Sequence, residues 1–178
     1  MKKGILLMAI LLAGCSSPNS ESIQKEEQIS VQSESKKLEF PPINQQEPIA
    51  KVDIHDDEAI VKSVGVPAKK IIDSVDSVGE PKKIYQFADS VFGTQIELSR
   101  SQILLAWIAV NEDESSRTKS LKSIAIAQHL ARAMLGIEGG KLVDEITSKG
   151  KIESQQIEGY QVTAGSCISG LCSLKIQR

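Results

Sequence analysis

The sequence is poor in aromatic side chains and has no strong cluster of positive charge. Its 178 residues include one Trp, two Tyr and three Phe, too few to line a carbohydrate groove with rings. Lys and Arg number 21 against 23 acidic residues, and no run of basic residues is longer than a pair such as Lys82-Lys83. A nucleic-acid-binding face needs clustered Lys and Arg to neutralise phosphates, so we expect no nucleic-acid partner.

Long hydrophobic runs are also scarce. A membrane-spanning helix needs roughly 20 apolar residues, whereas the apolar run near the start covers only residues 4–13 and is followed by polar residues 16–20. Two basic residues, Lys2 and Lys3, precede this run. A basic start, a short apolar stretch and small residues before a cysteine are the layout of a cleaved secretory signal.

The residues Leu12, Ala13, Gly14 and Cys15 resemble the lipobox of bacterial lipoproteins. The resemblance implies that residues 1–14 are removed as a signal peptide and that lipid is attached to Cys15. Two or more acyl chains anchor a protein persistently, because each buried methylene contributes about 0.8 kcal/mol. In bacteria with two membranes, Ser at the next position goes with export to the outer membrane. Ser16 therefore implies an anchor on the periplasmic side of the outer membrane; the alternative is an ordinary secretory signal with a chance cysteine.

The residues after Cys15 have the composition of a linker. Residues 16–50 are rich in Ser, Gln, Glu, Lys and Pro and show no apolar periodicity, so they cannot bury enough surface to offset the entropy of ordering. We expect residues 15–50 to form the lipidated cysteine and a disordered tether; the alternative is a segment that docks on its own domain, mainly at Leu38 to Ile43. Residues 51–178 have the size of a single domain.

Apolar spacing predicts three short helices at the start of this domain. Asp56 or Asp57 can cap a helix that ends near Val64. The spacing also predicts a helix from Pro67 to Gly79 and another that opens at Pro81 and ends before Gly93. The apolar residues that support the second and third helices are Ile71, Ile72, Val75, Val78, Ile84, Phe87, Ala88 and Val91.

The period then changes and indicates strands. Ile96 and Leu98 alternate with polar residues, and residues 103–110 form an apolar run typical of a buried central strand, with Trp107 in the core. The longest helix is predicted from a cap at Asp113 or Ser115 to about Leu135, followed by a shorter one over 140–149. The predicted fold class is therefore α+β: a small antiparallel sheet of about four strands with a C-terminal hairpin, packed against one long and several shorter helices.

The C-terminal hairpin carries the two remaining cysteines. Residues 160–164 and 174–176 alternate as its two arms, and Cys167 and Cys172 flank its tip. In an exported protein such a pair is expected to form a disulfide; a catalytic dithiol more often has two intervening residues at a helix start. Pairing Cys167 with Cys172 would turn the apolar residues of the two arms to opposite faces, so we expect a bulge near Gly165.

Candidate catalytic and metal-binding residues are few. The densest group of potential ligands is His55, Asp56, Asp57 and Glu58, which could hold a cation, but acidic residues at the start of a helix also cap exposed amides. The acidic residues of 111–114 have the same ambiguity. His129 lies within the long helix, and no motif places a serine or cysteine nucleophile near it.

These observations favour a non-enzymatic function. We expect no cofactor and no catalytic residue, with the membrane as one partner through the lipid on Cys15 and another envelope protein as the second. The expected function is therefore an interaction or assembly module that faces the periplasm. One alternative is a metal-assisted envelope hydrolase that uses His55, Asp56, Asp57 and Glu58. Another is a protein that binds a small apolar ligand between the long helix and the sheet.

The lipobox leads to a direct test. In Cys15→Ala, the chain should no longer be lipidated, and it should move from the membrane pellet to the soluble fraction after cell lysis, because no other membrane anchor is predicted. As a control, Ser16→Asp should keep the lipid but shift the protein toward the inner membrane in a two-membrane bacterium. Normal processing and unchanged sedimentation of Cys15→Ala would show that the anchor lies elsewhere.

Overall fold

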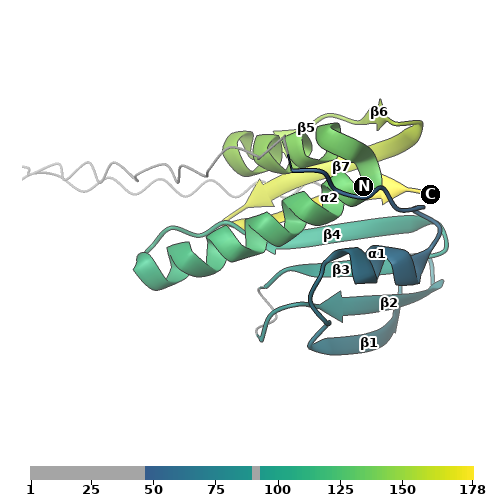
Figure 1. The fold of residues 1–178 in the computed structure, drawn as a ribbon, viewed down its shortest axis with the longest axis horizontal. Coiled ribbons are helices and arrows are strands. Elements are labelled where there is room, and N and C mark those ends of the chain that lie inside the picture. The colour runs from purple at the N-terminus through teal and green to yellow at the C-terminus, as the bar shows by residue number, and fades with distance from the viewer. Residues whose placement is uncertain (1–46, 90–92) are drawn as a thin grey trace, which may run out of the picture. The chain divides into compact units, whose positions relative to one another are not determined.

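The computed structural model describes residues 47–89 and 93–178, which belong to one compact unit. It contains an eight-stranded antiparallel sheet and two helices (Figure 1). The α+β class is thus confirmed, but the sheet is twice as large as predicted and the helices are fewer. The predicted signal peptide 1–14, Cys15, the predicted tether up to residue 46 and the segment Leu38 to Ile43 lie outside the described residues.

The strands occur in two groups separated by the long helix. The first group consists of α1 (Asp57–Ser63) and four strands joined as successive hairpins: β1 (Lys70–Val75), β2 (Pro81–Gln86), β3 (Gln95–Ser99) and β4 (Gln102–Ile108). After α2 (Glu114–Lys149) come β5 (Lys151–Ile152), β6 (Gln155–Ile157), β7 (Tyr160–Ile168) and β8 (Leu171–Gln177). The strand order is β1-β2-β3-β4-β8-β7-β5, and β6 pairs with β7. The C-terminal hairpin therefore lies next to β4, at the middle of the sheet.

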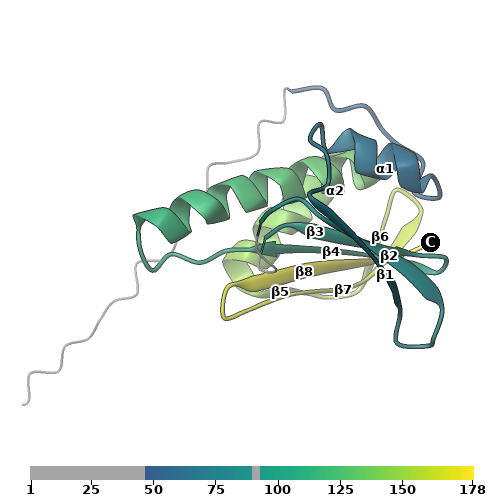
Figure 2. The same ribbon diagram turned by 90° about the horizontal axis from the view of Figure 1, so that it is seen from below.

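Both helices lie on one side of the sheet, as Figure 2 shows with the strands nearly edge-on. The register places Ile96, Leu105 and Leu174 in one row across β3, β4 and β8, and all three side chains are fully buried. Trp107, predicted to be a core residue, is only 1 % exposed. Its indole N–H donates to the Thr147 hydroxyl over 3.0 Å, which ties the end of α2 to β4.

Residues 67–89 differ from the prediction; residues 90–92, with Val91, lie outside the described residues. The segments with helical spacing after Pro67 and Pro81 form the hairpin of β1 and β2 instead. In its turn, the Asp76 carboxylate accepts hydrogen bonds from the amides of Val78 (3.0 Å) and Glu80 (2.9 Å). This turn reverses the chain at the point where the predicted helix would have continued. The β-branched residues on either side of it are well suited to the extended conformation. The helix predicted to end near Val64 is confirmed as α1, with Asp56 as its N-cap.

The long helix is broken where the sequence predicted a boundary. Gly136 has a non-helical backbone (φ 66°, ψ −161°) inside α2, so the element consists of two arms. Asp113 caps the first arm together with Ser116 in a capping box, and Gly150 ends the second in the left-handed conformation. The arms fold toward each other, as the hydrogen bond from the Gln128 amide on the first arm to the Asp144 carboxylate on the second arm shows.

Two glycines let the helical arms approach their neighbours closely. A Cβ atom on Gly139 would lie 2.2 Å from the Ala131 carbonyl oxygen, on the other arm of α2. A Cβ atom on Gly165 of β7 would lie 2.5 Å from Ile146 Cδ1 and 2.6 Å from Ile152 Cγ1. Both distances are far below van der Waals contact, so any larger residue at either position would force neighbouring elements apart.

The C-terminal hairpin confirms the predicted disulfide. Cys167 and Cys172 pair across β7 and β8, and their sulfur atoms are bonded. The expected bulge is present, but it lies between Val162 and Ala164 and not at Gly165. This shift pairs Val162 with Ile176, so both side chains face the helices and are fully buried. Position 165 has no room for a side chain, because Ile146 and Ile152 pack against its backbone.

Hydroxyl groups of α2 complete the hydrogen bonding of β4. The Ser123 hydroxyl accepts from the Ile108 amide over 3.0 Å and lies 2.8 Å from the Thr94 hydroxyl. Ser120 accepts from the Val110 amide over 2.8 Å. These bonds satisfy backbone groups at the end of the central strand and fix the first arm of α2 along it.

Among residues 47–89 and 93–178, neither helix has both the length and the apolar character needed to cross a bilayer.

The contact between the arms of α2 leads to a stability prediction. Gly139→Ala should lower the free energy of unfolding by about 1–3 kcal/mol, the usual cost of overpacking, because the new methyl group meets a backbone carbonyl. Glu138→Ala is the matched control and should cost at most about 0.5 kcal/mol, since it removes only a surface ion pair with Lys141. Chemical denaturation of both variants measures the difference, and equal stabilities would contradict the close packing.

A second prediction concerns pH and Asp144. Burial raises the pKa of the Asp144 carboxyl above its ordinary value of 3.8, although the hydrogen bond from Gln128 acts in the opposite direction. A raised pKa in the folded state favours folding at low pH, and this contribution is lost as the pH rises through the folded-state pKa. Asp144→Asn should therefore be more stable than the wild type at neutral pH.

The advantage of Asp144→Asn should shrink as the pH falls through the raised pKa of the folded protein, and it should vanish below 3.8, where the wild-type carboxyl is protonated in both states. The asparagine can still accept the hydrogen bond from Gln128. Thermal unfolding of both proteins at neutral and acid pH makes the comparison. A variant that is less stable at neutral pH would mean that the charged hydrogen bond outweighs burial.

Candidate interaction surface

The acidic cluster suspected of metal binding is occupied by structural contacts. Asp56 caps α1 by accepting from the Ala59 amide over 2.9 Å. Asp57 forms an ion pair of 2.6 Å with Arg178. Within the described part of the chain, no three His, Cys, Asp or Glu side chains gather in a group that could hold a metal ion.

Arg178 holds Asp57 in place. Its side chain is only 5 % exposed. The guanidinium donates to the carbonyl oxygens of Ser99 (2.7 Å) and Ile54 (2.8 Å) as well as to Asp57. It therefore ties the β3–β4 turn, the segment before α1 and the end of β8 together. Hydrogen bonds from a charged guanidinium are strong, so these contacts stabilise the fold. The same N–H groups are therefore not free to bind a ligand.

The structure also places the other residues that the sequence analysis named as candidates. The acidic residues before α2 act as its cap through Asp113, whose pKa is lowered mainly by the hydrogen bond from the Ser116 amide. His129 is half-buried on α2.

The predicted location for an apolar ligand, between α2 and the sheet, contains a cavity of about 440 Å³ bordered by Phe87, Ile108 and Ile126. Ligand binding there stays a prediction.

The most unusual surface lies around β1. The described residues include seven large hydrophobic side chains with high exposure, and four of them come from the short segment 66–78. We call these four the β1 surface; their exposed fractions are 48 % for Val66, 59 % for Ile71, 60 % for Val75 and 77 % for Val78. Scattered exposed aliphatics are common, but a concentration on one strand and its flanks is a mark of an interaction site.

The helices leave this part of the sheet uncovered. The α2 helix packs on β4, β5, β7 and β8, while α1 packs mainly on α2. Figure 1 shows β1 at the edge of the sheet, beyond both helices. Between α1 and the hairpin lies a hollow of about 640 Å³, lined by Val61, Val66, Pro67 and Tyr85 among others. Glu58 and Lys62 of α1 also line this hollow, which borders β2 through Tyr85 and the β1 surface through Val66.

The backbone of β1 is also open on one side. Among the described residues β1 pairs only with β2, so its other edge has no strand partner. Natural sheets usually protect such edges with charges, bulges or a covering helix. Only Lys70 and Asp73 carry charge in this strand, and β1 is six residues long without a register shift.

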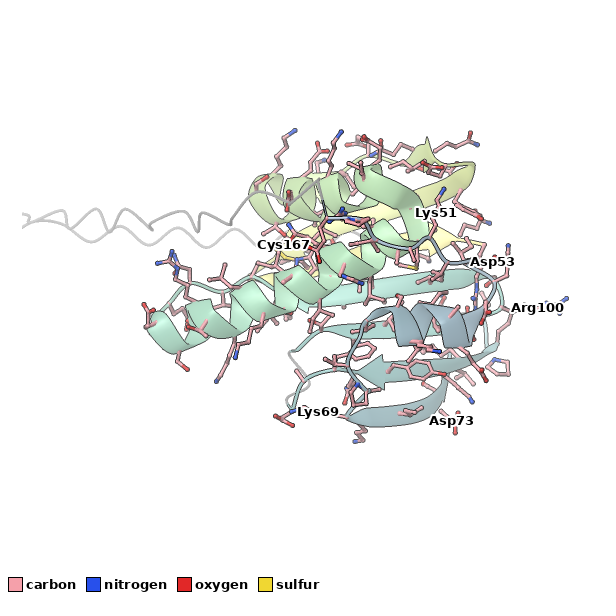
Figure 3. All side chains as sticks on the ribbon, viewed as in Figure 1. Lys51, Asp53, Lys69, Asp73, Arg100 and Cys167 are labelled. Carbon is pink, nitrogen blue, oxygen red and sulfur yellow. A yellow bond between two sulfur atoms is a disulfide. The ribbon has the colours of Figure 1, made fainter. Side chains whose placement is uncertain are left out.

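Asp73 is the one acidic residue of β1, whereas Lys69 and Lys70 lie at its start. Figure 3 shows Asp73 toward one end of β1 and Lys69, which precedes the strand, toward the other. Asp73 is exposed and lies directly opposite Lys83 of β2, but forms no ion pair within the part of the chain that the structure describes. Its carboxylate is therefore accessible to a cation approaching from outside the sheet.

A second, smaller apolar patch provides a useful comparison. Ile168 and Leu171 lie opposite each other at the tip of the C-terminal hairpin and are 71 % and 50 % exposed. Their two-residue turn, Ser169 and Gly170, has positive φ at both positions, which is typical of a tight hairpin. On the Leu171 side the strand is paired at both edges, because β8 lies between β4 and β7. The patch consists of two residues at a hairpin tip, whereas the β1 surface follows the open edge of a whole strand.

The sequence analysis did not find the β1 surface. Three of its residues, Ile71, Val75 and Val78, match helical spacing together with Ile72, and the sequence therefore predicted one side of a helix there. The signal that could have revealed it is the run Asp76 to Gly79, which is typical of a hairpin turn. Comparison of the chain with family models, with curated proteins and with solved structures gave no match.

Proposed function

We propose that this protein is a lipid-anchored, non-enzymatic module of the bacterial cell envelope that binds another envelope protein through the β1 surface. The observation that carries the proposal is the coincidence of exposed aliphatic side chains with an unpaired strand edge. The anchor on Cys15 would hold it on the periplasmic face of the outer membrane in a two-membrane bacterium.

Exposed apolar area on β1 favours a protein partner. Burying apolar surface contributes roughly 25 cal/mol per Å², so covering Ile71, Val75 and Val78 together would be a substantial source of affinity. A six-residue edge also offers backbone hydrogen bonds, which only another polypeptide can match in register. A small molecule in the neighbouring hollow would leave these backbone groups unused.

The predicted tether fits this function. A chain of about 35 residues behaving as a random coil has an end-to-end distance on the order of 30 Å. Attachment to a membrane that also holds the partner raises the effective concentration of the module without any new contact. A modest interface on β1 would then suffice for binding.

The contacts of Asp56 and Asp57 favour the non-enzymatic function over the alternative of a metal-assisted hydrolase. Asp56 and Asp57 already serve the α1 cap and Arg178. Recruiting them for a metal would cost the fold both interactions.

Photo-crosslinking in intact cells tests the proposal. A photoreactive amino acid placed at Val78 of the lipidated full chain should give one adduct of defined mass, because Val78 is the most exposed member of the β1 surface. Adding Ile71→Ser and Val75→Ser should reduce the adduct about tenfold, since two aliphatic contacts are lost.

The hairpin tip supplies the matched control. Ile168→Ser with Leu171→Ser removes a similar apolar area from the other patch and should leave the Val78 adduct unchanged. Melting curves of the variants confirm that the fold is intact. Absence of an adduct, or equal loss in the tip variant, would contradict binding through the β1 surface.

A further inference from the structure

We infer that the partner binds by adding an extended, antiparallel strand to the free edge of β1, and that this strand carries a basic side chain opposite Asp73 with aliphatic side chains two residues to either side. The inference rests on the proposed function and specifies the partner's chemistry. Three features of β1 support the inference. They are the outward direction of alternate backbone groups, the shared face of the side chains of Ile71, Asp73 and Val75, and the negative charge of Asp73.

The register shows which backbone groups of β1 face outward. The Phe87 amide donates to the Thr94 carbonyl over 2.9 Å, so in β2 the odd-numbered residues bond to β3 and the even-numbered residues face β1. The Asp76 amide donates to the Glu80 carbonyl over 2.8 Å, in phase with the pairs Ser74–Lys82 and Ile72–Ile84.

Hydrogen bonds alternate along an antiparallel pair. Since residues 70, 72 and 74 bond to β2, the N–H and C=O groups of Ile71, Asp73 and Val75 point away from the sheet. An added strand would therefore find three donors and three acceptors at a spacing that an extended chain matches.

The side chains of the same three residues also share one face. Ile71 pairs with Tyr85, which pairs with Ile96 of the buried row, so Ile71, Asp73 and Val75 lie on the face that the helices cover elsewhere. Residues directly opposite in an antiparallel pair have Cβ atoms about 5 Å apart. Each of the three exposed side chains would thus contact one side chain of the added strand.

The pattern of these contacts defines the partner. Ile71 and Val75 favour aliphatic side chains opposite them. Asp73 lies between the two and favours Lys or Arg, because opposite charges in cross-strand pairs stabilise and like charges destabilise. The positions of the three residues therefore select a strand of the form aliphatic, any residue, basic, any residue, aliphatic.

One register of pairing with a second copy of this chain is unfavourable. The antiparallel, twofold-symmetric pairing that sets Ile71 against Val75 of the second copy also sets Asp73 against Asp73. Two carboxylates directly opposite would repel each other. The charge in the middle of β1 thus disfavours the register of self-association in which the aliphatic residues Ile71 and Val75 face each other.

Two synthetic peptides test this inference on the mature lipidated chain in detergent. One has the sequence Thr-Val-Thr-Lys-Thr-Val-Thr and the other has Glu in place of Lys. The Lys peptide should bind about three- to tenfold more tightly, and Asp73→Lys should reverse the preference. Amide exchange at residues 71, 73 and 75 should slow on binding, while exchange at Ile168 should not change.

A backbone variant separates strand addition from simple charge attraction. Asp73→Pro removes an outward N–H but no bond to β2, and proline is tolerated at such edge positions. Asp73→Asn removes the charge and keeps the N–H. We expect the asparagine variant to retain weakened binding and the proline variant to lose it. Equal binding by both would overturn strand addition.

The outcomes distinguish the inference from the proposed function. If the Val78 adduct forms in cells but neither peptide binds, or both bind equally, strand addition with a basic partner is wrong while the β1 surface stands as an interaction site. If the Val78 adduct is absent, the proposed function fails whatever the peptides do. Sedimentation that shows a dimer dependent on Ile71 and Val75 would overturn the conclusion that the partner is a different protein.

Discussion

The packing of the helices on one face of the sheet is the constraint on which the remaining features depend. A helix is about 10 Å wide and neighbouring strands are about 4.8 Å apart, so one helical segment covers roughly two strands. The two arms of α2 cover β4, β8, β7 and β5, and α1, with seven residues, extends only about 10 Å. No described helix remains for β1. Its exposure follows from this geometry and from the strand order that puts it at the edge.

The covered part of the sheet is rigid because helix and strand are joined by polar bonds as well as by apolar packing. Ser120 and Ser123 bond to the backbone at the end of β4, and Thr147 accepts from Trp107. Gly139 and Gly165 allow contacts that a single methyl group would prevent. Continuous pairing with β2 and β3 and the Asp76 turn hold β1 in a fixed register, so an approaching strand would meet a template that is already ordered, and binding would cost less entropy.

The sequence was most informative where local chemistry decides the structure. The caps at Asp56 and Asp113, the break at Gly136 and the Cys167–Cys172 pair each depend on a few neighbouring residues, and each was predicted. The β1–β2 hairpin was not, because Ile71, Ile72 and Val75 lie on both faces of an edge strand and most are exposed. Without a single buried face, the strand has no alternating pattern, and helical spacing fits its residues by chance. The candidate site was missed for the same reason: the feature that makes β1 an interaction surface also removes its strand signal.

An open edge and a membrane anchor complement each other under the proposed function. Three outward residues offer up to six backbone hydrogen bonds, but each contributes only about 0.5–1.5 kcal/mol net of water, and the strand must be ordered on binding. Such an interface is weak for a freely diffusing protein. Confinement near a membrane raises the local concentration to the millimolar range, where weak binding becomes effective. Asp73 then contributes mainly specificity, because it favours strands with a basic residue opposite it over strands with an acidic one. The charge thus protects an exposed edge from aggregation while keeping it open to one class of partner.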